Sequence, residues 1–496
     1  MSTMSPKTRV AAWTAVLVAI SFGGSSACAA LARLAHARAG MTGAHSLVAG
    51  IRLPVGVVNA ALGAFPVTLG ALAVFASLGF AGWRLACAMR AAATIPERTI
   101  LLIQALVGLS LSFFAVTFSS DPYAYVLFAR AHGVFGLNPY IFFGQMGAIR
   151  DSILQQCLAF FGDPPPSDNY GPLWTIAVGL AGRMEAASSL WVQFWTQRVA
   201  AVAGAVACTA GVLRLLGKAT PDARRFGASL FAFHPLVLWE SGIGGHNDFL
   251  MLALAVWAFA VVDAYPLLAC ALLGVAIGIK FVPVLLLPLL IARVVRKAGA
   301  ASALLGAVVA LAIPVVAFTP FWTGHATILS LESLDASLGV SPTWLLVSPF
   351  AASGVANLPV AGSLHGTLVG ALTWGRLLQI ELDLVVFAII VAATVRVARG
   401  SSLREVWRVI AAFVWTLPSV NSWYVSWLTP AAAFGGTWAA YAWWFGALAG
   451  LHLAIDSGAV GSLPGAVGWA ALITVVFMGL PIALAYRARR PGTGEL

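Results

Sequence analysis

The sequence predicts an all-α fold, a polytopic transmembrane helical bundle of about 11–14 spans. Three observations indicate it. Hydrophobic residues make up 60% of the 496 residues and charged residues only 9%, whereas a soluble domain carries roughly 25% charged residues. Apolar runs follow one another along the chain with short loops between them, and Lys and Arg gather in alternate loops. We expect a single domain over 1–496 with no separate soluble domain.

The apolar runs differ in length, and several are shorter than the roughly 20 residues that a straight span needs. Pro and Gly interrupt them, which a membrane tolerates where helices line a protein-walled cavity. The number of spans therefore stays open. The runs lie at about 10–32, 54–83, 99–119, 191–213, 226–243, 249–264, 265–280, 281–295, 301–320, 375–396, 407–420, 424–440, 442–458 and 465–486.

The distribution of basic residues predicts the orientation. With the N-terminus in the cytoplasm, alternation places most Lys and Arg in cytoplasmic loops, as the positive-inside rule requires. The net charge of +11 then reflects topology. No nucleic-acid partner is expected, because no basic segment is interleaved with aromatics. The sequence therefore predicts a multi-pass protein of the cell's inner (plasma) membrane, with the lipid bilayer as its partner and the loop 120–190 extracytoplasmic.

That long loop begins with a polar and aromatic stretch, "SSDPYAYVLFARAHGVFGLNPY", directly after an apolar run. Asp121 stands at the boundary, where a carboxylate can act as general base on a hydroxyl arriving from water. Asp before Pro is also a common helix start, and the two interpretations are compatible. The other candidate residues of the stretch are Tyr123, Tyr125, Arg130, Asn138 and Tyr140.

Four further clusters stand out from the apolar background. Each has a structural alternative: the "HND" group a helix N-cap, Lys280 a snorkelling side chain, and the Trp and Tyr pair an interfacial aromatic belt. The functional alternatives are ligand binding, a phosphate contact and a surface on which sugar rings stack. The candidates are Tyr170 in "NYGPLW", His246, Asn247 and Asp248 in "HNDFLML", Lys280 in "GIKFVP", and Trp423 and Tyr424 in "NSWYVSW".

Motifs that are missing exclude other functions. The chain has no Walker A motif and no G-x-G-x-x-G that follows a strand, so no nucleotide-binding site is expected. It has no H-E-x-x-H and no G-x-S-x-G, which disfavours metalloproteases and serine hydrolases. The "HND" group lacks metal-ligand spacing. We expect no cofactor and no metal.

The five motifs, in their order between about residues 100 and 440, resemble the GT-C superfamily of integral-membrane glycosyltransferases. Within it they are most similar to the bacterial polyprenol-phosphate-mannose-dependent α-mannosyltransferases. Each motif alone is only weakly specific for this family, and the ordered set of five is a moderately strong signal. A second acid beside Asp121 is absent, which disfavours relatives that use an adjacent acidic pair.

The resemblance implies an inverting transfer of a sugar, mannose in the nearest family, from a polyprenyl-phosphate donor to a glycan or glycolipid acceptor on the outer face of the membrane. The resemblance implies that Asp121 is the base and makes Arg130, Lys280 and Arg198 the candidate cations for the donor phosphate. The residues that we expect to bind the sugar or acceptor are Tyr123, Tyr125, Asn138, Tyr140, Tyr170, His246, Asn247, Asp248, Trp423 and Tyr424.

A polyprenyl-lipid flippase or transporter without catalytic activity remains the alternative, because it would have the same apolar chain and membrane-embedded cations. It has less need of a long polar and aromatic loop on one face. Arabinose, glucose and aminoarabinose donors also remain open, as do the acceptor and the linkage.

Overall fold

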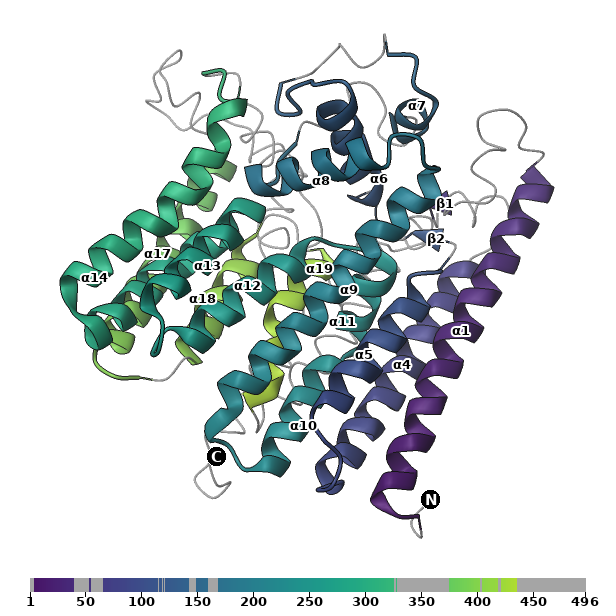
Figure 1. The fold of residues 1–496 in the computed structure, drawn as a ribbon, viewed down its shortest axis with the longest axis horizontal. Helices are drawn as coiled ribbons and strands as arrows, with labels where there is room; N and C mark the ends of the chain where they lie inside the picture. The colour runs from purple at the N-terminus through teal and green to yellow at the C-terminus, as the bar shows by residue number, and fades with distance from the viewer. Residues whose placement is uncertain are drawn as a thin grey trace.

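The computed structural model describes residues 4–39, 53–54, 66–114, 116–117, 119, 121–141, 149–158, 168–324, 327, 374–401, 404–417 and 421–434. Over these residues the fold is helical, as predicted (Figure 1). The exception is a parallel pair of two-residue strands, β1 (Leu53–Pro54) and β2 (Val116–Thr117). The sequence did not predict this pair, because two residues are too few to show the alternation typical of a strand.

The helices form a row, which Figure 1 shows from the N-terminal helices on one side to α14 and α17 on the other. On the N-terminal side α1 packs against α4 and α5, and α9 joins this group to α12, α13 and α14. The bounds are α1 (Pro6–Ala39), α4 (Pro66–Ala91), α5 (Arg98–Leu111), α9 (Leu190–Leu215), α10 (Pro221–Ala232), α12 (Asp248–Val261), α13 (Pro266–Ile279), α14 (Leu287–Phe318), α17 (Trp374–Ala398) and α18 (Arg404–Thr416).

Three helical segments in the described part are long and apolar enough to cross a membrane: Pro6–Ala27, Leu190–Lys218 and Val282–Phe321. The apolar helices α12 and α13 have 14 residues each. At 1.5 Å per residue they reach roughly 21 Å, less than the ~30 Å hydrocarbon core. Several predicted spans are thus real helices that are too short to cross alone.

Other predicted spans differ in detail from the structure. The runs 281–295 and 301–320 lie within η6 (Val282–Leu286) and α14, which leaves helical geometry at Gly299, where φ is +83°. The described part of the run at 424–440, which ends at residue 434, contains the short α19 (Ser422–Val425) and the 3₁₀ helix η10 (Ser426–Phe434). Pro430 inside η10 removes a backbone donor, which disfavours a longer helix. The runs 442–458 and 465–486 lie outside the described residues.

The segment that follows α5 forms a cap over one set of helix ends, at the top of Figure 1. It contains α6 (Asp121–Phe128), the π-helix η2 (Ala129–Val134), α7 (Ser152–Leu158) and α8 (Pro172–Met184). Helices α6 and α8 pack against η2, and α8 also contacts α13. The cap therefore places the N-terminus of α6 above the ends of helices from the second half of the chain.

A break in the helices beneath the cap brings polar residues into the bundle. After α11 (Pro235–Trp239) the chain forms the π-helix η5 (Glu240–Gly244) and turns at Gly245, where φ is +68°. Residues other than Gly rarely adopt this left-handed backbone conformation. Helix α12 then starts at Asp248. Short π-helical turns often lie at functional sites.

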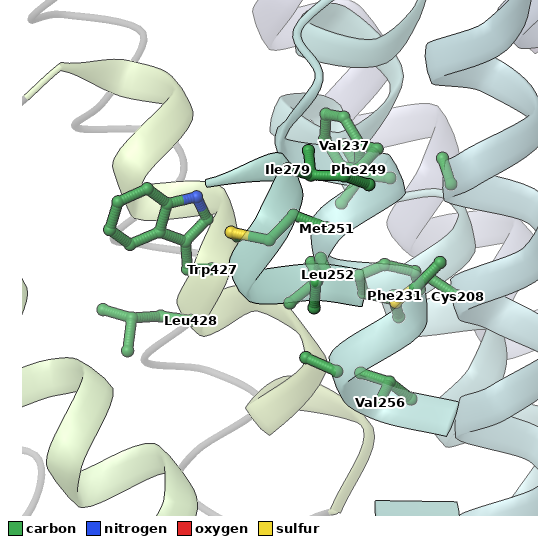
Figure 2. Close-up of a cluster of buried hydrophobic side chains, with 14 of the residues drawn as sticks. Cys208, Phe231, Val237, Phe249, Met251, Leu252, Val256, Ile279, Trp427 and Leu428 are labelled. Carbon is green, nitrogen blue, oxygen red and sulfur yellow. The ribbon is translucent and has the colours of Figure 1, made fainter. Parts of the chain in front are cut away.

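The core beneath this break is apolar. Figure 2 shows Cys208 of α9, Phe231 of α10, and Met251 and Leu252 of α12 packed together, with Met251 directed toward Trp427. These side chains are buried. Their packing holds α12 in place, and the polar residues of η5 and of the turn before α12 lie directly above it.

The helix ends away from the cap carry paired charges. Nη2 of Arg293 donates a 2.6 Å hydrogen bond to Asp263, and Nε of Arg396 lies 2.9 Å from Glu405. Arg224 likewise pairs with Glu97 at 2.5 Å. These residues belong to the loops that the distribution of basic residues assigns to the cytoplasm.

Candidate active site

Asp121 lies at the centre of a cluster that four distant segments build. The hydroxyl of Tyr170 donates a 3.0 Å hydrogen bond to Oδ2 of Asp121. Nδ1 of His246 lies 3.3 Å from the same oxygen. The Asp121 side chain is 19% exposed, whereas that of His246 is completely buried. The carboxylate is therefore held from behind by two groups and keeps an open side toward solvent.

His246 bridges two acids. Its Nε2 lies 3.3 Å from Oε2 of Glu240, a residue of η5 that is 2% exposed. Its ring stacks on Trp423, with centroids 4.2 Å apart and planes at 17°. Within the described residues neither ring nitrogen has a hydrogen-bond partner at favourable angles, so both contacts are ion-pair contacts at this geometry. Glu240 was not among the predicted site residues. The signal was an acid within an apolar run just before Gly-Gly.

Lys280 lies in the same cluster. Its Nζ donates a 2.9 Å hydrogen bond to Oδ1 of Asp248, which also accepts a 2.6 Å bond from the indole N–H of Trp427. Nζ is 5.6 Å from the ring centre of Tyr170, 5.0 Å from that of Tyr424 and 5.4 Å from that of Trp427. Aromatic faces attract a cation, so three rings and one carboxylate compensate the burial of the ammonium.

Asn247 and Tyr125 connect the cap to the turn before α12. The hydroxyl of Tyr125 donates a 3.3 Å hydrogen bond to Oδ1 of Asn247. Asn247 is at the N-cap position of α12 but makes no side-chain cap hydrogen bond, and its Nδ2 is buried without a partner. The structural alternative, a plain N-cap, therefore does not describe Asn247. Its amide is available to a polar ligand.

The loop that carries Tyr170 is joined to the segment that carries Lys280 by its backbone. The N–H of Gly171 donates a 2.9 Å hydrogen bond to the carbonyl of Ile279. A Cβ on Gly171 would overlap the carbonyl oxygen of Gly278. Only Gly permits this approach, which sets the distance between the Tyr170 ring and the Lys280 ammonium.

The substitution Gly171→Ala should therefore destabilise the protein. The added methyl group meets backbone rather than a flexible side chain, so the loop must move away, and we expect a loss of about 1–3 kcal/mol. Thermal unfolding of the purified protein measures this loss. Gly217→Ala is the matched control, because nothing lies within 4 Å of its added Cβ. Equal melting temperatures for the two variants would contradict the close approach.

The ionisation of Asp121 and His246 follows from their contacts. Burial alone raises the pKa of Asp121, but the contacts with His246, Lys280 and Tyr170 outweigh it, so the pKa lies below its ordinary value. Burial lowers the pKa of His246, whereas Asp121 and Glu240 raise it, and the result is a pKa of about 9. Near neutral pH Asp121 is a carboxylate beside an imidazolium, so it is ready to accept a proton.

The two candidate arginines lie outside this cluster of contacts. Nε of Arg130 donates a 2.8 Å hydrogen bond to Oδ1 of Asp151. Arg198, which is 1% exposed, donates from Nη1 to the carbonyls of Ser112 at 3.1 Å and Phe114 at 2.9 Å, and its Nε and Nη2 have no hydrogen-bond partner within the described part of the chain.

Three other candidates have packing contacts. Tyr123 packs edge-to-face on Phe194 with centroids 4.7 Å apart. The amide of Asn138 donates to the carbonyl of Phe321 at 2.9 Å. The hydroxyl of Tyr140 donates to the carbonyl of Tyr170 at 2.9 Å. Tyr140 thus supports the loop that presents Tyr170 to Asp121.

The cluster combines a partly exposed base with buried cations, which suits proton abstraction beside a developing anion. Within the described ranges, no group of three or more His, Cys, Asp or Glu is placed to hold a metal ion.

A family model confirms the resemblance found in the sequence. The model described as "Alpha-(1->6)-mannopyranosyltransferase, N-terminal domain" matches residues 20–296. This segment is more than half of the chain and includes Asp121, Tyr170, Glu240, His246 and Lys280. It ends before Trp423. No curated protein matches the chain.

Proposed function

Because the chain belongs to the alpha-(1->6)-mannopyranosyltransferase family, we propose that it transfers mannose from a polyprenyl-phosphate donor to a hydroxyl group of a glycan or glycolipid. Membership of this family makes the protein a glycosyltransferase. The donor, the acceptor class, the inverting course of the reaction and the residue roles below are our proposal.

One observation carries the proposal. The partly exposed carboxylate of Asp121 and the ammonium of Lys280 lie at the same residue, Tyr170: its hydroxyl bonds Asp121 at 3.0 Å, and its ring centre is 5.6 Å from Nζ of Lys280. An inverting transfer from a phosphate donor needs a base on one side of the anomeric carbon and a cation beside the leaving group on the other. Tyr170 therefore links the two groups that such a transfer requires.

The proposed reaction is a single displacement. Asp121 accepts the proton of the acceptor hydroxyl while that oxygen attacks the anomeric carbon of mannose. The bond between this carbon and the phosphate oxygen breaks, and its electron pair leaves with polyprenyl phosphate. The leaving group is already an anion, so a cation rather than a general acid stabilises it.

Lys280 is the cation that we assign to the phosphate. Its side chain is 12% exposed and donates to Asp248, and the ammonium has two further N–H groups. Arg198 is the second cation in our proposal, because two of its nitrogens are buried without partners. Trp423 and Tyr424, whose ring centres are 5.7 Å apart, are proposed to contact the sugar or acceptor.

An apolar cavity adjoins the polar cluster at Trp427. It lies between α12, η6, α18 and η10, and Val282, Pro283 and Trp427 are among its lining residues. Figure 2 shows Met251 and Trp427, which line it, facing each other. Because the indole N–H of Trp427 bonds Asp248, this ring joins the polar cluster to the cavity. We assign the cavity to the first isoprene units of the donor.

Filling this cavity should therefore affect donors according to chain length. In Ala255→Phe the added ring takes up volume in the cavity, and we expect the KM for a long-chain donor to rise about tenfold. The KM for a donor that carries a methyl group in place of the isoprene chain should change little. Val316→Phe is the control, because Val316 is 68% exposed on α14. An equal change for both donors would remove the isoprene chain from this cavity.

We propose that the protein has about 11–14 spans in the plasma membrane, with its N-terminus cytoplasmic, its active site extracytoplasmic and one domain over residues 1–496. The ion pairs of Arg224, Arg293 and Arg396 lie at the helix ends away from the cap, which supports this orientation (Figure 1).

A competition between donor classes tests the proposal. Purified protein in nanodiscs receives radiolabelled mannose either on polyprenyl phosphate or on a nucleoside diphosphate, together with mannose oligosaccharides as acceptors. We expect transfer from the lipid donor alone. Transfer from the nucleotide sugar would contradict the donor, and lipid translocation into liposomes without transfer would support a flippase.

A further inference from the structure

We infer that Glu240 is a positioning residue that keeps His246 in its doubly protonated form and thereby holds Asp121 ionised and oriented for proton abstraction. This inference rests on the proposed function, in which Asp121 is the base. It adds a second buried acid behind the imidazole.

The geometry of His246 carries the inference. Its two ring nitrogens face two carboxylates, Asp121 at 3.3 Å and Glu240 at 3.3 Å. A neutral imidazole has one N–H and one bare nitrogen, and a bare nitrogen facing a carboxylate oxygen is repelled. Two ionised carboxylates are therefore both satisfied only by an imidazolium. Without Glu240, a neutral imidazole with its single N–H on Nδ1 would satisfy Asp121.

Burial makes this arrangement depend on Glu240. His246 is 0% exposed and Glu240 is 2% exposed, so water cannot replace either partner. Among the residues that the structure describes, Oε1 of Glu240 is buried without a hydrogen-bond partner, and His246 is the contact that compensates the charge of this acid. An uncompensated buried charge is strongly destabilising, and the ion pair is correspondingly persistent.

The backbone and Trp423 restrict movement of the two side chains. A Cβ on Gly244 would lie 2.7 Å from Oε2 of Glu240 and 2.9 Å from Nε2 of His246, so even a methyl group here would displace both. The face of Trp423 lies 4.2 Å from the imidazole ring and favours its cationic form. The ring is therefore clamped in the orientation that directs Nδ1 toward Asp121.

The other charged and titratable groups around this pair do not replace Glu240. From α9, Arg198 packs its aliphatic part against Gly245 and donates to the carbonyls of Ser112 and Phe114. From beyond the turn, Lys280 is paired with Asp248. Three tyrosines also lie in the cluster: Tyr125, Tyr170 and Tyr424. Among the described residues, Glu240 is the carboxylate at ion-pair distance from Nε2.

The pH dependence of mannosyl transfer by Glu240→Gln tests the inference. In the wild type kcat/KM should decline on the alkaline side as His246 loses its proton, near pH 9. In Glu240→Gln this limb should move to lower pH by at least about one unit, with kcat near neutral pH reduced about tenfold or more. Glu405→Gln is the control, because Glu405 is also buried (4% exposed) and ion-paired, but lies in the first turn of α18, outside the cluster around Asp121.

A spectroscopic arm separates this inference from the proposed function. With ¹⁵N-labelled histidine, the ring nitrogens of His246, assigned by their absence in His246→Asn, report its charge without any turnover. We expect an imidazolium at pH 7.5 in the wild type and earlier deprotonation in Glu240→Gln. A neutral His246 in the wild type, or an unchanged alkaline limb in an active Glu240→Gln, would overturn the inference. Absence of transfer by the wild type would count against the proposed function alone.

Discussion

Replacing Asp121 by Asn should lower kcat for mannosyl transfer by about 10²–10⁴-fold, while the Kd for the donor changes less than about threefold. The amide has nearly the shape of the carboxylate but cannot accept the proton of the acceptor hydroxyl. In this variant the buried imidazole of His246 keeps Glu240 as a carboxylate partner at 3.3 Å. Single-turnover transfer and donor binding, measured separately on the purified variant, give the two quantities.

Asp222→Asn is the matched control for this variant. Asp222 lies in the first turn of α10, its side chain is 62% exposed, and it pairs with Arg225. It belongs to a loop assigned to the cytoplasmic face, so its activity should equal that of the wild type. Full activity of Asp121→Asn would place the base elsewhere, and Asp248 would then be the first carboxylate to examine.

Replacing Lys280 by Gln should raise the KM for the donor by about 10–100-fold, because a charge-assisted contact with phosphate is worth about 1.5–3 kcal/mol. A smaller effect on kcat should accompany it, since the leaving phosphate gains charge as the bond breaks. Donor titrations at saturating acceptor measure both parameters. A KM equal to that of the wild type would remove Lys280 from the phosphate site.

The partner of Lys280 complicates this variant. Asp248 is completely buried, and without the ammonium its carboxylate would lose its counterion, at a cost of about 3–5 kcal/mol. The double variant Lys280→Gln/Asp248→Asn restores a neutral pair and should recover most of the thermal stability. It should keep the raised donor KM. Recovery of the wild-type KM in the double variant would show that the defect of the single variant was structural.

Part of the fold was predictable because its signals are local. Apolar composition and the runs between loops predict a helical membrane protein, and the structure confirms the helical class and three candidate spans. Helix lengths were less predictable. Helices α12 and α13 have 14 residues each: α12 ends at Val261, shortly before Pro266 starts the next helix, and α13 ends at Ile279, before Lys280 adopts extended backbone geometry. A hydropathy pattern does not show where a neighbouring polar loop will fill the space above such a short helix.

The residues of the candidate site were found as polar groups in apolar surroundings. That signal selected Asp121, His246 and Lys280, which the structure places in one cluster. It did not predict their pairing, because contacts between segments more than 100 residues apart leave no local pattern. Glu240 was left out of the predicted site although an acid in an apolar run is itself a local signal, and the ion pair between Arg130 and Asp151 was not predicted.

The anomeric configuration of the product tests the central claim most directly. Purified protein receives polyprenyl-phosphate mannose of β configuration, labelled with ¹³C at the anomeric carbon, and an oligosaccharide acceptor, and the product is read by NMR in a single turnover. A single displacement with Asp121 as base predicts an α-linked product from the wild type and formation of this product at least about 10²-fold more slowly by Asp121→Asn. A β-linked product, or an α-linked product formed at the wild-type rate by Asp121→Asn, would contradict the account.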